Sequence, residues 1–286
     1  MCQLLGMNCN TPTDILFSFE GFHRRGGLTD HHADGWGIAF FEGRGVRLFL
    51  DDKPAIDSPV ASLVRQYSIK SKNVIAHIRK ATQGEVNLTN CHPFQRELWG
   101  QYWIFAHNGN LLDFAPPQGS HYQPVGSTDS ERAFCYLLET LRQRWRQPPA
   151  REALFAAVET LAAELRSHGV CNFMLSNGEW LFVHCSTKLH YIVRQAPFPT
   201  AHLVDDDVTV DFSTVTTPQD RVAIIATVPL TDNEYWTPLQ DGELILFADG
   251  LPLQHSISSP PTRIDAASCG SACGAEAATK ADPAQN

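Results

Sequence analysis

The amino-acid sequence predicts an α+β fold, because strand-forming segments come first, two adjacent amphipathic helices follow, and strands then return. An α/β fold would alternate strands and helices along the chain, which this order does not do. Hydrophobic residues make up 43% of the 286 residues, enough for a sizeable core. Two sheets covered by helices would fit this order of elements.

The first half of the chain contains one clear hairpin. Segments 35–42 and 45–50 are rich in apolar and β-branched residues and flank Gly43-Arg44. A short helix is expected over 58–67, with Ser58 as its N-cap and Pro59 in its first position. Further strands are expected over 73–79 and 102–107.

Two helices are predicted in the middle of the chain, separated by Pro148-Pro149. Their apolar residues recur at helical spacing on one face: Ala133, Phe134, Leu137, Leu138 and Leu141 in the first helix, and Leu154, Phe155, Val158, Leu161, Ala162 and Leu165 in the second. Next come segments 172–176 and 179–185, which flank an Asn177-Gly178 turn and predict another hairpin. The remaining strands are expected at 190–194, 222–228 and 243–248.

Composition and charge limit the class of protein. We expect one domain over residues 1–258 and a disordered tail over 259–286, where Ser, Pro, Ala and Gly dominate. The net charge of −9 argues against a nucleic-acid-binding protein. The sequence shows neither a secretory signal nor an apolar stretch of the ~18 residues that a membrane span needs. Eight cysteines without such a signal predict reduced thiols and a cytoplasmic protein.

Cys2 directly follows the initiator Met1. If Met1 is cleaved, the α-amino group of Cys2 lies beside its own thiol. An α-amine has a pKa of about 7.7–8.0 and can accept the thiol proton near neutral pH. Position alone favours a different interpretation, a buried and inert cysteine in a first strand.

Three downstream motifs change this balance: R-K-A-T at 79–82 after a predicted strand, A-H-N-G-N at 106–110 at another strand end, and S-T-D-S-E at 127–131 before a helix. Each has a structural explanation when taken alone. Arg79 could be a surface charge, and Asn108-Gly109 is a common turn dipeptide. Ser127, Thr128 or Asp129 could cap the helix, with a capping box to Glu131.

Together and in this order, the motifs resemble the class II glutamine amidotransferases, which are N-terminal-nucleophile hydrolases. The same pattern recurs in the glutaminase domain of glutamine phosphoribosylpyrophosphate amidotransferase. Segments 32–38 (H-A-D-G-W-G-I), 76–79 (A-H-I-R), 92–94 (H-P-F) and 185–190 (C-S-T-K-L-H) are similar to the small stand-alone, YafJ-like amidotransferases of bacteria. The resemblance covers roughly residues 1–255. It implies a four-layer α/β/β/α sandwich of the Ntn-hydrolase type, with two mostly antiparallel sheets between helical layers.

The resemblance also implies catalytic roles. Cys2 would attack the side-chain amide carbon of glutamine, release ammonia and form a glutamyl thioester that water converts to glutamate. The Asn108 side-chain amide and the Gly109 backbone N–H match the oxyanion hole, whose donors are worth roughly 3–4 kcal/mol each. No metal or cofactor is implied. His31, His32 and Asp34 could suggest metal ligands, but the resemblance implies that segment 31–37 enters a strand and that its Gly and Trp shape the pocket.

Substrate recognition is implied for four further residues. Arg79 matches the clamp for the α-carboxylate, which guanidinium can bind with two parallel hydrogen bonds. Thr82 matches a second carboxylate contact, and Asp129 matches the acceptor for the α-ammonium. His107, which precedes the oxyanion asparagine, is grouped with these residues because we expect it to position the loop and not to act as a base.

Three functions remain open at this point. The first is glutamine hydrolysis, with a separate synthase as a possible partner that accepts the ammonia. The second is hydrolysis of another γ-glutamyl amide or peptide in thiol metabolism. The third is a catalytically silent, glutamine-sensing subunit. Cys91 departs from the expected pattern, and it is either a second thiol near the site or a buried structural cysteine. The pair Cys269/Cys273 supplies only half of a zinc site, and we expect no role for it.

Overall fold

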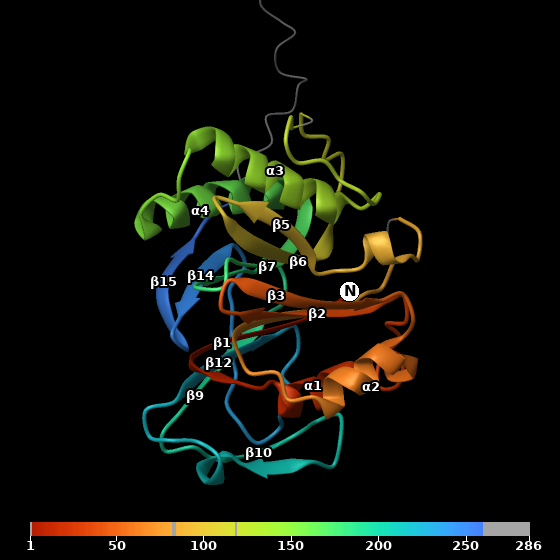
Figure 1. The fold of residues 1–286 in the computed structure, drawn as a ribbon, viewed down its shortest axis with the longest axis vertical. Helices are drawn as coiled ribbons and strands as arrows, with labels where there is room; N and C mark the ends of the chain where they lie inside the picture. The colour runs from red at the N-terminus through yellow and green to blue at the C-terminus, as the bar shows by residue number, and fades with distance from the viewer. Residues whose placement is uncertain (1, 82–83, 118, 260–286) are drawn as a thin grey trace, which may run out of the picture.

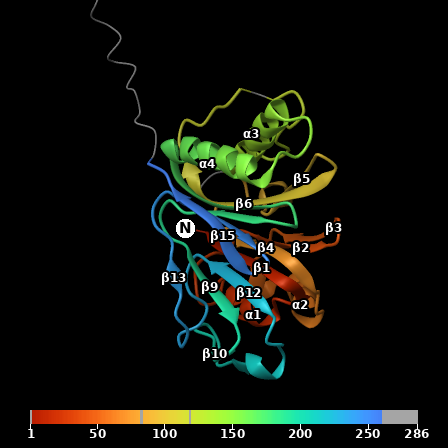
Figure 2. The same cartoon turned by 90° about the vertical axis from the view of Figure 1, so that its left-hand side faces the viewer.

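Two antiparallel β-sheets lie face to face, and each sheet carries two helices on its outer face (Figure 1). This computed structural model describes residues 2–81, 84–117 and 119–259. Helices α3 and α4 form one outer layer and α1 and α2 the other, and a view turned by 90° shows the same succession of layers (Figure 2). The predicted α+β class and the four-layer α/β/β/α sandwich are confirmed.

The larger sheet has seven strands and places the start of the chain near its centre. Its order is β13 (Thr237–Pro238), β9 (His190–Gln195), β12 (Arg221–Ala226), β1 (Gln3–Thr13), β4 (Ser71–Ile78), β2 (Trp36–Glu42) and β3 (Gly45–Asp51). Strand β1 pairs with β12 on one side, where Leu5 lies opposite Ala226, and with β4 on the other, where Gln3 lies opposite Ile78. The residues that follow Met1 are therefore held by two ladders.

The smaller sheet has six strands. Its order is β15 (Leu251–Ile257), β14 (Glu243–Ala248), β8 (Leu181–His184), β7 (Gly169–Ser176), β6 (Gln101–Leu111) and β5 (Phe94–Leu98). A separate two-stranded ribbon consists of β10 (Thr200–His202) and β11 (Thr209–Asp211). Strand β6 extends through the whole A-H-N-G-N motif, although the sequence predicts this motif at a strand end. The motif is therefore fixed by pairing along β7 and is not a loop.

The helices are α1 (Leu16–Arg24), α2 (Pro59–Gln66), α3 (Asp129–Arg144) and α4 (Arg151–Ser167). Two N-caps that the sequence suggested are present: the Ser58 hydroxyl accepts the Ala61 N–H at 3.2 Å, and the Thr128 hydroxyl accepts the Glu131 N–H at 3.2 Å. Both bonds satisfy donors that a helix start would otherwise leave unpaired.

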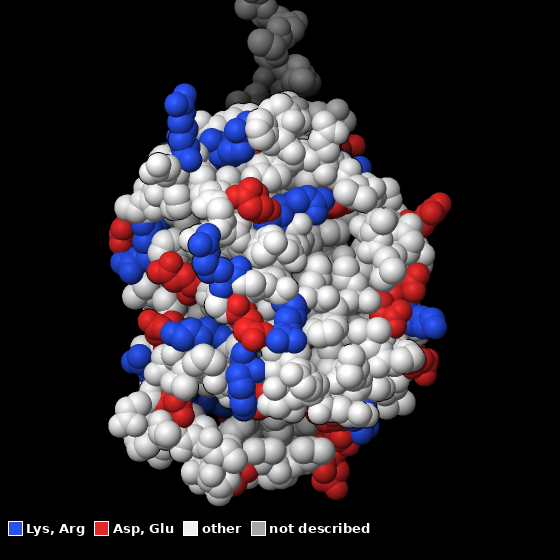
Figure 3. All heavy atoms as spheres, in the orientation of Figure 1, with Lys and Arg blue, Asp and Glu red and all other residues white. Residues whose placement is uncertain are grey.

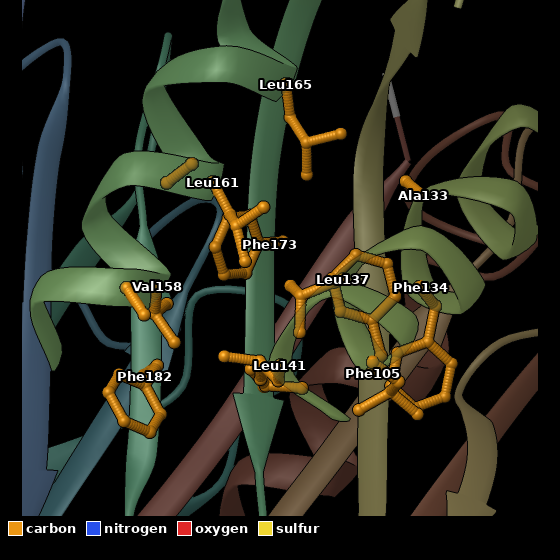
Figure 4. Packing of buried hydrophobic residues seen from close by; sticks show 14 of the residues in the cluster. Phe105, Ala133, Phe134, Leu137, Leu141, Val158, Leu161, Leu165, Phe173 and Phe182 are labelled. Carbon is orange, nitrogen blue, oxygen red and sulfur yellow. The ribbon is translucent and has the colours of Figure 1, made fainter. Parts of the chain in front are cut away.

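Three apolar layers hold the sandwich together. The layer between α3–α4 and the six-stranded sheet is rich in aromatic rings, and Phe105 of β6 stacks on Phe134 of α3 with centroids 5.2 Å apart (Figure 4). A second layer packs α1 and α2 on the seven-stranded sheet, and a third fills the space between the sheets. Leu4, Ala106 and Met174 belong to this third layer, so the inner faces of both sheets meet beside the start of β1.

Candidate active site

Cys2 lies at the start of β1 on the face that meets the second sheet. Side chains alternate along a strand, so Cys2 shares its face with Leu4, which is buried between the sheets. The Lys80 N–H donates to the Cys2 sulfur at 3.2 Å, and the thiol can donate to the Lys80 carbonyl at 3.4 Å. The thiol is therefore held against the chain immediately after Arg79.

The surroundings of Cys2 favour the neutral thiol. Burial raises the pKa of Cys2 above its ordinary value, although the Lys80 N–H and the positive charge of Arg79 act in the opposite direction. A thiol is a weak nucleophile, so catalysis by Cys2 would require a base that takes its proton.

The oxyanion residues predicted from the sequence meet Cys2 from the other sheet. The Asn108 side-chain amide donates to the backbone carbonyl of Cys2, and Asn108 is 1% exposed. Gly109 follows in β6, where a Cβ atom would lie 1.8 Å from the Val170 carbonyl oxygen and 2.6 Å from His107 Nε2. Only glycine fits this position, because any side chain would force β6 and β7 apart.

Asn172 of β7 supports Asn108, although no local sequence pattern marks it. Asn172 is directly opposite Asn108 in the β6–β7 pairing and is fully buried. Its Nδ2 donates to the Asn108 carbonyl at 3.0 Å and to the Thr187 hydroxyl at 2.8 Å, while its Oδ1 accepts the backbone N–H groups of Ser186 and Thr187 at 3.0 and 3.1 Å. The C-S-T-K-L-H segment thus anchors strand β6 at Asn108 through one amide.

Arg79 follows β4, the strand beside β1, and its side chain is 3% exposed. Its guanidinium donates to the Glu85 carbonyl at 3.0 Å and to the Gly84 carbonyl at 3.4 Å. Arg79 is therefore a buried cation that holds the segment after the R-K-A-T motif, and the interpretation as a surface charge is wrong. Thr82, the second expected carboxylate contact, lies outside the described residues.

Asp129 is the first residue of α3 and points toward β6. Because Thr128 caps the helix, the Asp129 carboxylate is available for other contacts. It accepts the Leu111 N–H at 2.7 Å and the Ser130 N–H at 2.8 Å. Ser130 also contacts His107, whose Nδ1 lies 2.8 Å from the serine hydroxyl. A buried carboxylate beside β6 is the kind of group that an ammonium ion requires.

His107 is a buried, neutral imidazole. Burial lowers its pKa, and the negative charge of Asp129 opposes that shift. Besides its contact with Ser130, its Nε2 lies 3.3 Å from the Val170 carbonyl. These contacts fix the ring between β7 and α3, as a positioning residue requires.

Trp36 does not shape the site, contrary to our expectation. It is fully buried and packs on Phe19 of α1, with ring centroids 5.8 Å apart, because its side chain alternates to the helix-covered face of β2. Its neighbour Gly37 packs closely against the H-P-F segment, where a Cβ would lie 2.4 Å from the His92 carbonyl oxygen. Within the described ranges no group of three or more His, Cys, Asp or Glu side chains is arranged to hold a metal ion.

Cys91 is a buried core thiol. It is 1% exposed, and burial raises its pKa to about 11. Of the two interpretations left open for this residue, the structural one is favoured, since an inaccessible thiol of high pKa is unreactive. The Cys269/Cys273 pair lies outside the described residues.

Comparison with known proteins identifies the family. The chain belongs to the class II glutamine amidotransferases, because the sequence profile of the family "Glutamine amidotransferases class-II" matches residues 1–270. A relative from Haemophilus influenzae is 58% identical over 266 residues, which cover 93% of this chain and 90% of the relative. The protein YafJ of Escherichia coli K12 is 53% identical over 251 residues, 87% of this chain and 98% of its own. Both carry glutamine amidotransferase names that are provisional.

Solved structures agree. A crystal structure from Pseudomonas aeruginosa PA01, described as a glutamine amidotransferase on the basis of prediction, is 50% identical and superposes with a TM-score of 0.72, covering 88% of this chain and all of that one. The Bacillus subtilis glutamine phosphoribosylpyrophosphate amidotransferase superposes with a TM-score of 0.55 at 15% identity, which shows a shared fold.

Two further observations concern membranes and nucleic acids. Among the helices that the structure describes, none is long and apolar enough to cross a membrane. The face in Figure 3 mixes Lys and Arg with Asp and Glu, and its described residues form no extended field of positive charge.

Proposed function

We propose that this chain hydrolyses the side-chain amide of L-glutamine through Cys2, after removal of Met1. The observation that supports the proposal is the hydrogen bond from the Asn108 amide to the Cys2 backbone carbonyl, which joins a donor of one sheet to the residue that begins the central strand of the other. A nucleophile and an oxyanion donor at one point are the minimal set for acyl transfer.

The chemistry proceeds in two balanced steps. The Cys2 α-amine takes the thiol proton, and the sulfur bonds to the δ-carbon of glutamine to form a tetrahedral oxyanion that Asn108 and Gly109 stabilise. When the oxyanion collapses, the carbon–nitrogen bond breaks, the α-ammonium returns its proton to the leaving nitrogen, and ammonia departs. Water then adds to the thioester by the same route and releases glutamate and the free thiol.

The two ends of the substrate are read by opposite charges. Arg79 binds the α-carboxylate and Asp129 binds the α-ammonium. Both residues are buried, and electrostatic attraction is stronger there than in water. For the carboxylate to bind, the Arg79 guanidinium shares or exchanges its bonds to Gly84 and Glu85. Thr82 is proposed as the second carboxylate contact.

Recognition by these residues is confined to the glutamyl half of a substrate. A γ-glutamyl amide or peptide therefore fits the same contacts, and a substrate panel that compares L-glutamine with γ-glutamyl amides separates the two activities. A separate synthase that accepts ammonia is compatible only with the first activity.

Intact mass spectrometry tests the proposal. After incubation with a glutamine analogue that carries an electrophile at the δ-carbon, we expect a chain that lacks Met1 and carries one adduct on Cys2. Cys2→Ala should abolish both labelling and turnover, whereas Cys91→Ala, a matched loss of a buried thiol, should leave both intact. Retained Met1 without an adduct would instead support the silent, glutamine-sensing subunit.

A further inference from the structure

Asn90 links the two segments that carry the substrate-reading charges. It is 1% exposed and ends a short 3₁₀ turn, η2 (Leu88–Asn90). Its Nδ2 donates to the Glu85 carbonyl at 2.9 Å and to the Ser127 hydroxyl at 3.2 Å, and its Oδ1 accepts the Ser127 N–H at 2.9 Å. One buried amide therefore joins the segment after Arg79 to the segment before Asp129.

The link reaches the charged residues on both sides. The Glu85 carbonyl that accepts from Asn90 also accepts from Arg79 Nη1 at 3.0 Å. On the other side, Ser127 immediately precedes the helix cap Thr128, which is followed by Asp129. A continuous path of hydrogen bonds and two peptide units thus runs from the guanidinium to the carboxylate through Asn90.

Two glycines show how closely the segments approach at this point. A Cβ atom on Gly126 would lie 2.3 Å from Asn90 Oδ1, and one on Gly84 would lie 2.9 Å from the Ser127 hydroxyl and 3.0 Å from Asn90 Nδ2. Gly84 also has a φ of 74°, which few other residues adopt. The two segments are therefore packed closely around the asparagine amide, with no room for a side chain at either glycine.

We propose that Asn90 is a positioning residue, which sets the separation of Arg79 and Asp129 and thereby the fit of an α-amino acid between them. The proposal rests on the glutaminase function argued above. Asn90 touches neither Cys2 nor Asn108 in the described contacts, so it should affect substrate affinity much more than the chemical step. A purely structural asparagine would instead lower stability and affect both quantities.

The backbone of the turn does not depend on the Asn90 side chain. The Asn87 side chain accepts the Asn90 N–H at 3.2 Å and the Thr89 hydroxyl at 2.7 Å. Asn87→Ala is therefore the matched control, because it weakens the same turn without removing the link between Glu85 and Ser127.

The test uses covalent labelling by a diazoketone analogue of L-glutamine, 6-diazo-5-oxo-L-norleucine. Its diazo carbon takes the thiol proton, dinitrogen leaves, and the Cys2 sulfur bonds to that carbon. Rates measured against probe concentration separate the affinity constant, KI, from the maximal rate of labelling, kinact. Thermal unfolding of each variant is measured in parallel.

For Asn90→Ala we expect KI to rise about tenfold to thirtyfold, with kinact within about threefold of the native value. Asn87→Ala should leave KI within about twofold. The effect of Asn90→Ala should shrink in an Arg79→Lys background, because the two residues then no longer act through one carbonyl. An unchanged KI in Asn90→Ala, or a loss confined to kinact and melting temperature, would overturn the proposal. A native protein that is neither labelled at Cys2 nor active on glutamine would overturn the proposed function and this inference with it.

Discussion

Replacing Asn108 by alanine isolates the oxyanion interaction. The side-chain amide donates to the Cys2 carbonyl, and its Oδ1 has no hydrogen-bond partner within the described part of the chain. The backbone carbonyl of Asn108 stays bonded to Asn172 Nδ2, and the pairing of β6 with β7 uses main-chain groups. The strand should therefore keep its place when the amide is removed.

The expected loss follows from this geometry. Removal of one oxyanion donor costs roughly 10²–10³ in kcat, or about 2.7–4 kcal/mol. Arg79 and Asp129 are untouched, so KM should stay within about threefold. Folding loses one hydrogen bond, worth about 1 kcal/mol, which corresponds to a fall of a few degrees in Tm for a chain of this size.

Glutamate release from L-glutamine at saturating concentration measures kcat, and calorimetry measures Tm. Asn177→Ala, in the turn between β7 and β8, is the control asparagine and should keep native kcat. Should Asn108→Ala turn over within about threefold of the native rate while still depending on Cys2, Asn108 is not the oxyanion donor and the assignment of the site is wrong.

Three other substitutions test separate parts of the structure. Arg79→Lys cannot form a two-bond contact with a carboxylate, so KM for glutamine should rise about tenfold or more with little change in kcat, and an unchanged KM would contradict its role. Gly109→Ala places a Cβ 1.8 Å from the Val170 carbonyl and should destabilise the fold by about 1–3 kcal/mol and reduce activity; a stable, active variant would show that β6 and β7 separate freely. His92→Phe tests pH dependence: both His92 ring nitrogens lack partners in the described residues, and burial holds the pKa of His92 well below its usual range. Below about pH 6.5 the unfolded chain therefore takes up a proton that the folded chain does not. As the pH decreases further, the free energy of unfolding decreases by about 1.4 kcal/mol per pH unit for each such histidine. Urea unfolding at pH 7 and pH 5 should show a smaller loss for His92→Phe, and equal losses would contradict a neutral, buried His92.

The elements that could be predicted are those with strong local patterns. Helices α3 and α4 follow from their apolar periodicity, and the β7–β8 hairpin from its Asn-Gly turn. Helix α1 could not be predicted, because Ile15 supplies no capping side chain and Gly21 lies inside its nine residues. It exists because its aromatic residues Phe19 and Phe22 are buried against the seven-stranded sheet, which is a tertiary cause.

The same distinction holds at the site. Cys2, Arg79, Asn108 and Asp129 belong to motifs whose order in the chain is informative. Asn90 and Asn172 act across 37 and 64 residues of sequence, and no local pattern marks either of them. The position of Trp36 was wrongly inferred because the two faces of β2 serve different layers, and a motif does not say which of its residues points to which face.

The topology explains how a residue at the start of a chain can hold a precise position. Chain termini usually fray unless tertiary contacts hold them. Here Leu4 donates its N–H to the Thr227 hydroxyl at 2.9 Å and accepts the Thr227 N–H at 3.1 Å, while Gln3 pairs with β4 on the other side. Cys2 thus extends from a central strand, Arg79 from the strand beside it, Asn108 from the opposite sheet and Asp129 from the helix that covers that sheet. Because three strands from two sheets and one helix each supply one group, these groups come together only when the two sheets have packed. Folding therefore also brings together the residues of the site.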